Sequence, residues 1–243
     1  MQKKIPNIIV ALDHMTPDEA RHFTANFGPE LMPWIKIGLE LFVQGGEQLV
    51  IEFKRMGFHI FLDLKLFDIP NTVSQTIHRL KNLGIDLLTV HSLGGPAMLD
   101  GAVLAAEGSS IRLLGVTLLT SVSSKDLKRL PFVALASGPS REKIVEALID
   151  VCAQSSLAGV VCGLSDLACA PIKERVQRFG LVTVTPGIRP SFSSVEGDDQ
   201  VAVGTPRMAI RSGIDHVVIG RPITQALDPQ VALKLVREEF SVC

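Results

Sequence analysis

Eight short apolar runs recur along the chain, and longer segments with a helical spacing of apolar positions separate them. Short apolar runs bounded by turn residues are typical of buried strands, and their regular alternation with helices is typical of βα units around a parallel sheet. The runs predict strands at residues 7–13, 34–38, 59–65, 87–92, 111–120, 159–163, 181–186 and 216–220. Eight βα units in 243 residues predict an α/β fold with one domain, a closed (β/α)8 TIM barrel over residues 1–243.

Local capping signals mark where several of the intervening helices begin and end. The segment Thr16-Pro17-Asp18-Glu19 combines an N-cap, a proline at the first helical position and two acids in the first turn, which predicts a helix over 16–27. Glycines suited to a left-handed C′ conformation end three further helices. These helices are expected at 40–56, 70–83 and 165–179, stopping at Gly57, Gly84 and Gly180.

Two segments are too long to be simple connections between a strand and a helix. They are residues 121–140 and the Ser-, Asp- and Gly-rich residues 188–204. Loops of this length within a compact domain are usually lids or binding loops, so we expect them beside a functional site.

The charge balance argues against a nucleic-acid partner. Lys and Arg number 24 against 25 Asp and Glu, and the pI is near 6.6, so the chain has no broad basic field. An anionic ligand must therefore be bound by local groups. No apolar run approaches the roughly 18 residues of a membrane span. The apolar stretch after Lys3 and Lys4 is broken by Pro6, Asn7 and Asp13, which argues against a signal peptide.

The cysteines and histidines show no metal-binding pattern, so no metal ion is expected. The cysteines form no CxxC pair and are interpreted as reduced structural thiols of a cytoplasmic protein, and five histidines have neither HxH nor HxxxH spacing. These residues are Cys152, Cys162, Cys169, Cys243, His14, His22, His59, His78 and His216. His91, at the end of the predicted fourth strand, is interpreted as a hydrogen-bonded rim residue rather than a general base.

Polar side chains lie where the predicted strands end, which is where barrels of this kind carry their reacting groups. They are Asp13, Lys36, Asp63, Lys65, His91, Ser92, Thr120 and Ser121. Because side chains alternate along a strand, Asp63 and Lys65 share one face and the leucines beside them occupy the other. We therefore expect Asp63 and Lys65 at the barrel mouth, with Asp68 on the following loop beside the same ammonium group.

A lysine flanked by carboxylates stays protonated, because each nearby opposite charge favours the ammonium form. Lys65 would then hold a proton for a reaction that forms a carbanion and neutralises it in place. The same residues also fit an ion-pair network that only stabilises the barrel. The residues alone leave both interpretations open.

Two glycine–arginine pairs after the last two predicted strands favour a phosphate site. Gly187 and Gly220 let backbone amides approach an anion, and Arg189 and Arg221 add guanidinium groups that suit a dianion. Surface arginines beside turn glycines are the alternative for either pair alone. Their occurrence after consecutive strands favours phosphate.

The segment from Asp63 to Thr72, DLKLFDIPNT, matches the DxKxxDIPNT signature, and on it the chain resembles the orotidine 5′-monophosphate decarboxylases. Further segments match in the family's order over nearly the whole chain. They are residues 11–13, 35–38, 119–121, 185–190 and 219–223. The loop after Arg189 departs from the family pattern, because Gln200 lies further along than expected, which indicates a small insertion.

The resemblance implies decarboxylation of orotidine 5′-monophosphate without metal or cofactor. Lys65 would protonate C6 of the pyrimidine, and Asp63, Lys36 and Asp68 would complete a charged relay around the leaving carboxylate. The implied substrate contacts are Asp13 and Lys36 at the ribose hydroxyls, Thr72 at the ribose, Thr120 at the pyrimidine edge and Gln200 between pyrimidine and phosphate. The resemblance also implies a homodimer in which Asp68 and Thr72 reach the neighbouring subunit's site.

Two other functions fit part of the pattern. A metal-dependent phosphosugar decarboxylase or aldolase of the same barrel group shares the DxKxxD core, but the segment Ile69-Pro70-Asn71-Thr72 and the paired arginines argue against it. A catalytically silent nucleotide-binding barrel is the other alternative. Nucleotide binding alone does not require a lysine between acids, which argues against this second alternative.

Overall fold

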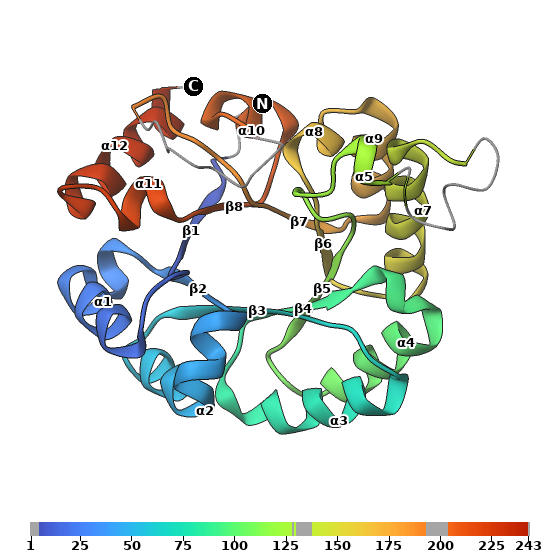
Figure 1. The fold of residues 1–243 in the computed structure, drawn as a ribbon, viewed down its shortest axis with the longest axis horizontal. Coiled ribbons are helices and arrows are strands. Elements are labelled where there is room, and N and C mark those ends of the chain that lie inside the picture. The colour runs from blue at the N-terminus through green and yellow to red at the C-terminus, as the bar shows by residue number, and fades with distance from the viewer. Residues whose placement is uncertain (1–4, 128, 130–137, 193–203, 243) are drawn as a thin grey trace.

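The computed structural model describes residues 5–127, 129, 138–192 and 204–242, and its centre is a closed barrel of parallel strands (Figure 1). Neighbouring strands pair in chain order, and β1 closes the barrel by pairing with β8. The strands are β1 (Asn7–Ala11), β2 (Trp34–Gly38), β3 (His59–Leu66), β4 (Leu87–His91), β5 (Arg112–Val116), β6 (Gly159–Val161), β7 (Val182–Thr185) and β8 (His216–Ile219). The predicted (β/α)8 barrel is confirmed.

Helices surround the barrel on its outer side (Figure 1). The α-helices are α1 (Pro17–Leu31), α2 (Leu39–Arg55), α3 (Pro70–Leu80), α4 (Gly95–Ala106), α5 (Ser124–Leu127), α7 (Arg141–Gln154), α8 (Leu164–Leu167), α9 (Ala170–Phe179), α10 (Pro206–Ser212), α11 (Arg221–Thr224) and α12 (Pro229–Val242). Two 3-10 turns, η1 (Lys81–Leu83) and η2 (Ser92–Gly94), follow α3 and β4. Within the described ranges, no helix combines the length and apolar character needed to cross a membrane.

Strand side chains alternate between two apolar cores. Those that point into the barrel form a small cluster, which includes Phe61 and Leu114. Those that point outward pack against the helices in a larger cluster, which includes Leu62. Leu64 and Leu66 pack against this outer cluster, so the apolar face of β3 is turned toward the helices as the alternation predicted.

Several predicted strands are shorter than the apolar pattern suggested, β5 most of all, and one predicted helix is divided. β5 stops at Val116 because its neighbour β6 ends at Val161, so the sheet offers no further partner. The predicted helix over 165–179 is split into α8 and α9, and Pro171 lies in the first turn of α9. Proline has no N–H to donate and its ring clashes with the preceding turn, so the helix ends before it and restarts.

The glycines predicted to end helices have the expected backbone. Gly57, Gly84 and Gly180 have φ values of 95°, 73° and 64°, in the left-handed region that a side-chain-bearing residue avoids. A fourth glycine, Gly28 with φ 64°, interrupts α1 after Phe27, so the regular part of that helix matches the predicted 16–27.

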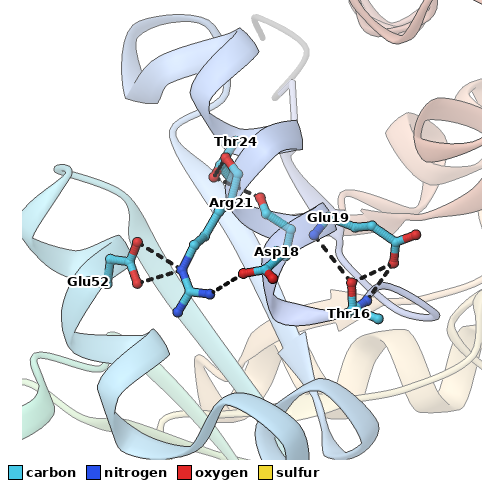
Figure 2. Close-up of polar contacts among 7 residues, drawn as sticks. Thr16, Asp18, Glu19, Arg21, Thr24 and Glu52 are labelled. Atoms are coloured by element: carbon cyan, nitrogen blue, oxygen red, sulfur yellow. Dashed lines mark hydrogen bonds and ion pairs between the residues drawn. The ribbon is translucent and has the colours of Figure 1, made fainter.

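The start of α1 shows how sequence signals become local structure (Figure 2). The Glu19 amide donates to Oγ1 of Thr16 at 3.3 Å, and the Thr16 amide donates to Oε2 of Glu19 at 2.7 Å, which completes a capping box. Arg21 donates to Glu52 of α2 at 2.9 Å and to Asp18 at 2.8 Å. The capping box fixes where α1 begins, and Arg21 links α1 to α2.

We predict that Thr16→Ala lowers the free energy of unfolding by about 1 kcal/mol, because the hydroxyl that accepts the Glu19 amide and donates to the Glu19 carboxylate is lost. Urea denaturation followed by circular dichroism measures the change. Ser241→Ala is the control, since that exposed hydroxyl only bonds the Arg237 carbonyl within α12. An equal loss of unfolding free energy in Thr16→Ala and Ser241→Ala would show that the capping box does not stabilise the fold more than an ordinary surface hydrogen bond.

Candidate active site

A cavity of about 340 Å³ opens at the carboxyl ends of the barrel strands. Its size lies in the range of small-molecule binding sites. The polar residues that line it are Asp13, His14, Lys36, Asp63, Lys65, Thr120, Ser121, Arg189 and Arg221. Ala11, Phe61 and Val218 belong both to this lining and to the inner apolar cluster, so the cavity has an apolar floor.

Four charged side chains form a continuous chain along one wall of the cavity. Asp13 Oδ1 lies 2.6 Å from Lys36 Nζ, Lys36 Nζ lies 3.6 Å from Asp63 Oδ2, and the same Asp63 oxygen lies 2.8 Å from Lys65 Nζ. The inner pair is shielded, with side-chain exposures of 9% for Lys36 and 13% for Asp63, whereas Asp13 and Lys65 are each 40% exposed. The Lys65 ammonium is therefore accessible from the cavity, and the Asp63 carboxylate that binds it is more shielded from solvent.

The ionisation of Asp63 is set by competing effects. Burial raises the pKa of its carboxyl, but the Lys36 and Lys65 ammonium groups and hydrogen bonds from Lys65 and Thr89 outweigh burial, so the pKa lies below its usual range. Asp63 is thus a carboxylate at neutral pH and can pair with both ammonium groups.

The backbone of β3 is irregular where these groups lie. Its pairing with β4 shifts register between Leu62 and Leu66, and Lys65 has a φ of 49°, which is uncommon for a residue with a Cβ. β-bulges re-aim side chains near functional sites. Lys65 lies at this irregularity and lines the cavity beside Asp63.

The predicted phosphate-binding groups line the part of the cavity formed by the last two strands. Arg189 follows β7 and Arg221 opens α11, directly after β8. The Arg189 amide donates to the Gly204 carbonyl at 2.8 Å, and the Gly204 amide donates to the Gly187 carbonyl at 3.1 Å. The two ends of the 188–204 segment are therefore fastened to each other, and Arg189 lies at this junction.

Asp68 and Thr72 do not join this site within one chain. Asp68 is exposed, and its Oδ1 accepts the Ile69 amide at 2.7 Å at the entry to α3. Among the described residues it forms no ion pair with Lys65, so the expectation that it lies beside the ammonium of its own chain is wrong. β3 continues to Leu66, and neither Asp68 nor Thr72 is among the residues that line the cavity.

Three further expectations have different outcomes. Gln200 lies outside the described residues. Thr120 lines the cavity as expected, although it belongs to the turn after β5 rather than to the strand. His91 accepts the Leu93 amide through Nδ1 at 3.4 Å, and burial followed by the charge of Lys65 lowers its pKa, which fits a rim residue.

Sequence reasoning missed two polar residues of this region. His14 lines the cavity and lies 3.3 Å from Glu40, and its position next to Asp13 was the available signal. Thr89 donates to Asp63 from the middle of β4. Its signal was the two-residue spacing from His91, which puts Thr89 on the face of β4 that points into the barrel.

Cys152 and Cys162 lack the character of nucleophiles. Burial raises the pKa of the Cys152 thiol to about 11 and that of Cys162, which lines the cavity, to about 12. Both are free, as is Cys169, which agrees with structural thiols. Within the described part of the chain, no three His, Cys, Asp or Glu side chains are grouped to hold a metal ion.

The lowered pKa of Asp63 makes a prediction about acid stability. Because the folded chain binds this proton more weakly than the unfolded chain, Asp63 stabilises the fold above about pH 4, and that contribution is lost as the pH falls through the folded value. Denaturation at a series of pH values should give a steeper loss of unfolding free energy below about pH 4 for wild type than for Asp63→Asn. If the unfolding free energy of wild type and of Asp63→Asn fell equally steeply in this range, the lowered pKa of Asp63 would be contradicted.

The chain is similar to known proteins over nearly its whole length. The orotidine 5′-phosphate decarboxylases of Nitrosomonas eutropha and Nitrosomonas europaea are each 43% identical, over 96% and 97% of both chains. The crystal structure of orotidine 5′-phosphate decarboxylase from Lactobacillus acidophilus has a TM-score of 0.79 at 33% identity, covering 98% of this chain and 99% of that chain. Since residues 6–236 match the description "Orotidine 5′-phosphate decarboxylase / HUMPS family", the chain belongs to that family.

Proposed function

We propose that this chain converts orotidine 5′-monophosphate to uridine 5′-monophosphate, a step of pyrimidine biosynthesis, with Lys65 as the proton donor and without metal or cofactor. The observation that carries the proposal is the Lys65 ammonium, held 2.8 Å from a buried carboxylate in a cavity that also contains two arginines. The names of the related decarboxylases support the choice of substrate.

In the proposed reaction the bond between C6 and the carboxylate breaks, CO2 leaves, and the electron pair stays on C6. The Lys65 ammonium stabilises that charge as it develops and then transfers a proton to C6. Asp63 holds the Lys65 ammonium in place before the reaction, and Lys36 in turn pairs with Asp63. Solvent returns the proton to the Lys65 amine after the product leaves.

The remaining cavity residues suit a nucleotide. Arg189 and Arg221, with the backbone near Gly220, would bind the phosphate dianion. Asp13 and Lys36 would bind the ribose hydroxyls, and Thr120 lies in the lining where a pyrimidine edge would reach. Gln200 is proposed to bridge pyrimidine and phosphate from the 188–204 segment. Phosphate binding can then help to close this segment and exclude water.

We also propose that a homodimer completes the site, with Asp68 and Thr72 supplied by the neighbouring subunit. Phe67 and Ile69, on either side of Asp68, are 60% and 67% exposed. Exposed large apolar side chains are typical of surfaces that bind another protein. A second copy that covers them would bring Asp68 toward a partner's cavity. A cytoplasmic location is inferred from the free thiols and the nucleotide substrate.

We predict that the purified chain decarboxylates orotidine 5′-monophosphate in the presence of EDTA, and that Lys65→Ala lowers kcat by more than about a thousandfold while uridine 5′-monophosphate still binds. Loss of orotidylate absorbance measures turnover, and calorimetry measures binding. The control is Lys54→Ala, which removes a Lys–Asp pair of the same 2.8 Å length, with Asp86, outside the cavity.

Turnover by Lys65→Ala within tenfold of wild type would refute the role of Lys65. Activity that EDTA removes and Mg²⁺ restores would favour the metal-dependent phosphosugar enzymes of the same barrel group instead.

The shared site gives a second prediction. Lys65→Ala and Asp68→Ala chains, each nearly inactive alone, should recover roughly a quarter of wild-type activity when refolded together in equal amounts, since each hybrid dimer has one intact site. A mixture of Lys65→Ala with Asp63→Asn should recover nothing, because both residues belong to the same chain's part of the site. If native mass spectrometry shows hybrids but activity stays absent, the shared site is wrong.

A further inference from the structure

Thr89 makes two hydrogen bonds that join the two residues at the centre of the cavity wall. Its hydroxyl accepts the backbone amide of Lys65 at 2.8 Å and donates to Asp63 Oδ1 at 2.9 Å. Thr89 is fully buried in β4 and does not line the cavity, so it has no route to the substrate itself. Its effect must pass through Asp63 and Lys65.

The position of Thr89 coincides with the irregularity of β3. Leu62 pairs with Leu88 and Leu66 pairs with Val90, so the three residues 63–65 lie opposite Thr89 alone. The surplus residues bulge from the sheet, and Lys65 takes the left-handed φ of 49°. Its amide then bonds a side chain, Thr89, in place of a strand carbonyl.

A hydroxyl is well suited to this position. The Lys65 amide can only donate, so the Thr89 oxygen accepts from it, and the hydroxyl hydrogen is left for Asp63. A methyl group in its place would leave the buried amide without an acceptor and Asp63 Oδ1 without this donor. Asp63 would remain ionised, because Lys36 from β2 and Lys65 from β3 still face it.

We propose that Thr89 is a positioning residue, whose hydroxyl holds the left-handed backbone of Lys65 and the carboxylate of Asp63 together and thereby places the Lys65 ammonium in the cavity. This inference rests on the proton-donating role proposed for Lys65. Since the ionisation of Asp63 is supported by two lysines, the contribution of Thr89 is one of geometry. Misplacement of a reacting group affects turnover more than it affects binding of the nucleotide.

The chain contains a matched control on the opposite side of the barrel. Thr183 of β7 accepts the Asp215 amide at 2.9 Å and donates to Asp215 Oδ2 at 2.8 Å, and it is also buried. Asp215 precedes β8, at the amino ends of the strands and away from the cavity. Thr183→Val therefore removes the same pair of hydrogen bonds without touching the site.

The test compares Thr89→Val, Thr89→Ser and Thr183→Val by steady-state decarboxylation, by binding of uridine 5′-monophosphate and by thermal denaturation. We expect Thr89→Val to lower kcat about tenfold to a hundredfold while KM and product binding stay within about threefold. Thr89→Ser keeps the hydroxyl and should return kcat to within about threefold of wild type. Thr183→Val should lower the Tm yet leave kcat and KM unchanged.

Provided that Lys65→Ala abolishes turnover, three kinetic results would overturn the proposal: a kcat for Thr89→Val within threefold of wild type, a serine variant as slow as the valine variant, or an equal loss of kcat in Thr183→Val. Should Thr89→Val fail to fold, Thr89→Ala removes the same hydroxyl with less bulk and takes its place in each comparison.

A crystal structure of Thr89→Val separates this inference from the proposed function, because it reports on Thr89 without any assay. We expect Lys65 to leave its left-handed conformation or its ammonium to move away from Asp63. An unchanged Lys65 overturns the inference whatever the enzyme does. If instead Lys65 moves but Lys65→Ala of the otherwise native chain keeps its turnover, the proposed role of Lys65 fails and the positioning by Thr89 stands.

Discussion

The site depends on one buried carboxylate that is shared by two ammonium groups. Asp63 is 13% exposed, and a charge so far removed from water is stable only when opposite charges and hydrogen bonds compensate it. Lys36 and Lys65 supply the charges, and Asp13 in turn balances Lys36. Each group is paired with the next, so the four form one connected unit.

The barrel makes this arrangement possible because it brings together residues that are distant in sequence. Asp13 follows β1, Lys36 lies on β2 and Asp63 on β3, and parallel strands deliver all three to the same mouth. Beneath them the inner cluster, including Phe61 and Val218, fills the barrel with apolar side chains. This floor keeps water from approaching the charges from below, which strengthens their interactions.

Local patterns predicted much of this molecule, and the failures have a common physical cause. The eight strands, the cap at Thr16 and the shared face of Asp63 and Lys65 all follow from the spacing of residues close in sequence. The end of β5 depends on the length of its neighbour β6, which is distant in sequence. The contact of Thr89 with Asp63 depends on the register of β3 against β4, which the sequence of neither strand reveals by itself.

The two ends of the 188–204 segment are hydrogen-bonded to each other. The position of Arg189 therefore does not depend on the length of the chain that follows it. With the Arg189 amide and Gly187 carbonyl both bonded to Gly204, residues added or removed between these anchors need not displace the guanidinium. Lengthening such a closed loop costs little, about 0.6 kcal/mol for each doubling. Evolution can therefore vary the length of this part of the chain while Arg189 keeps its place.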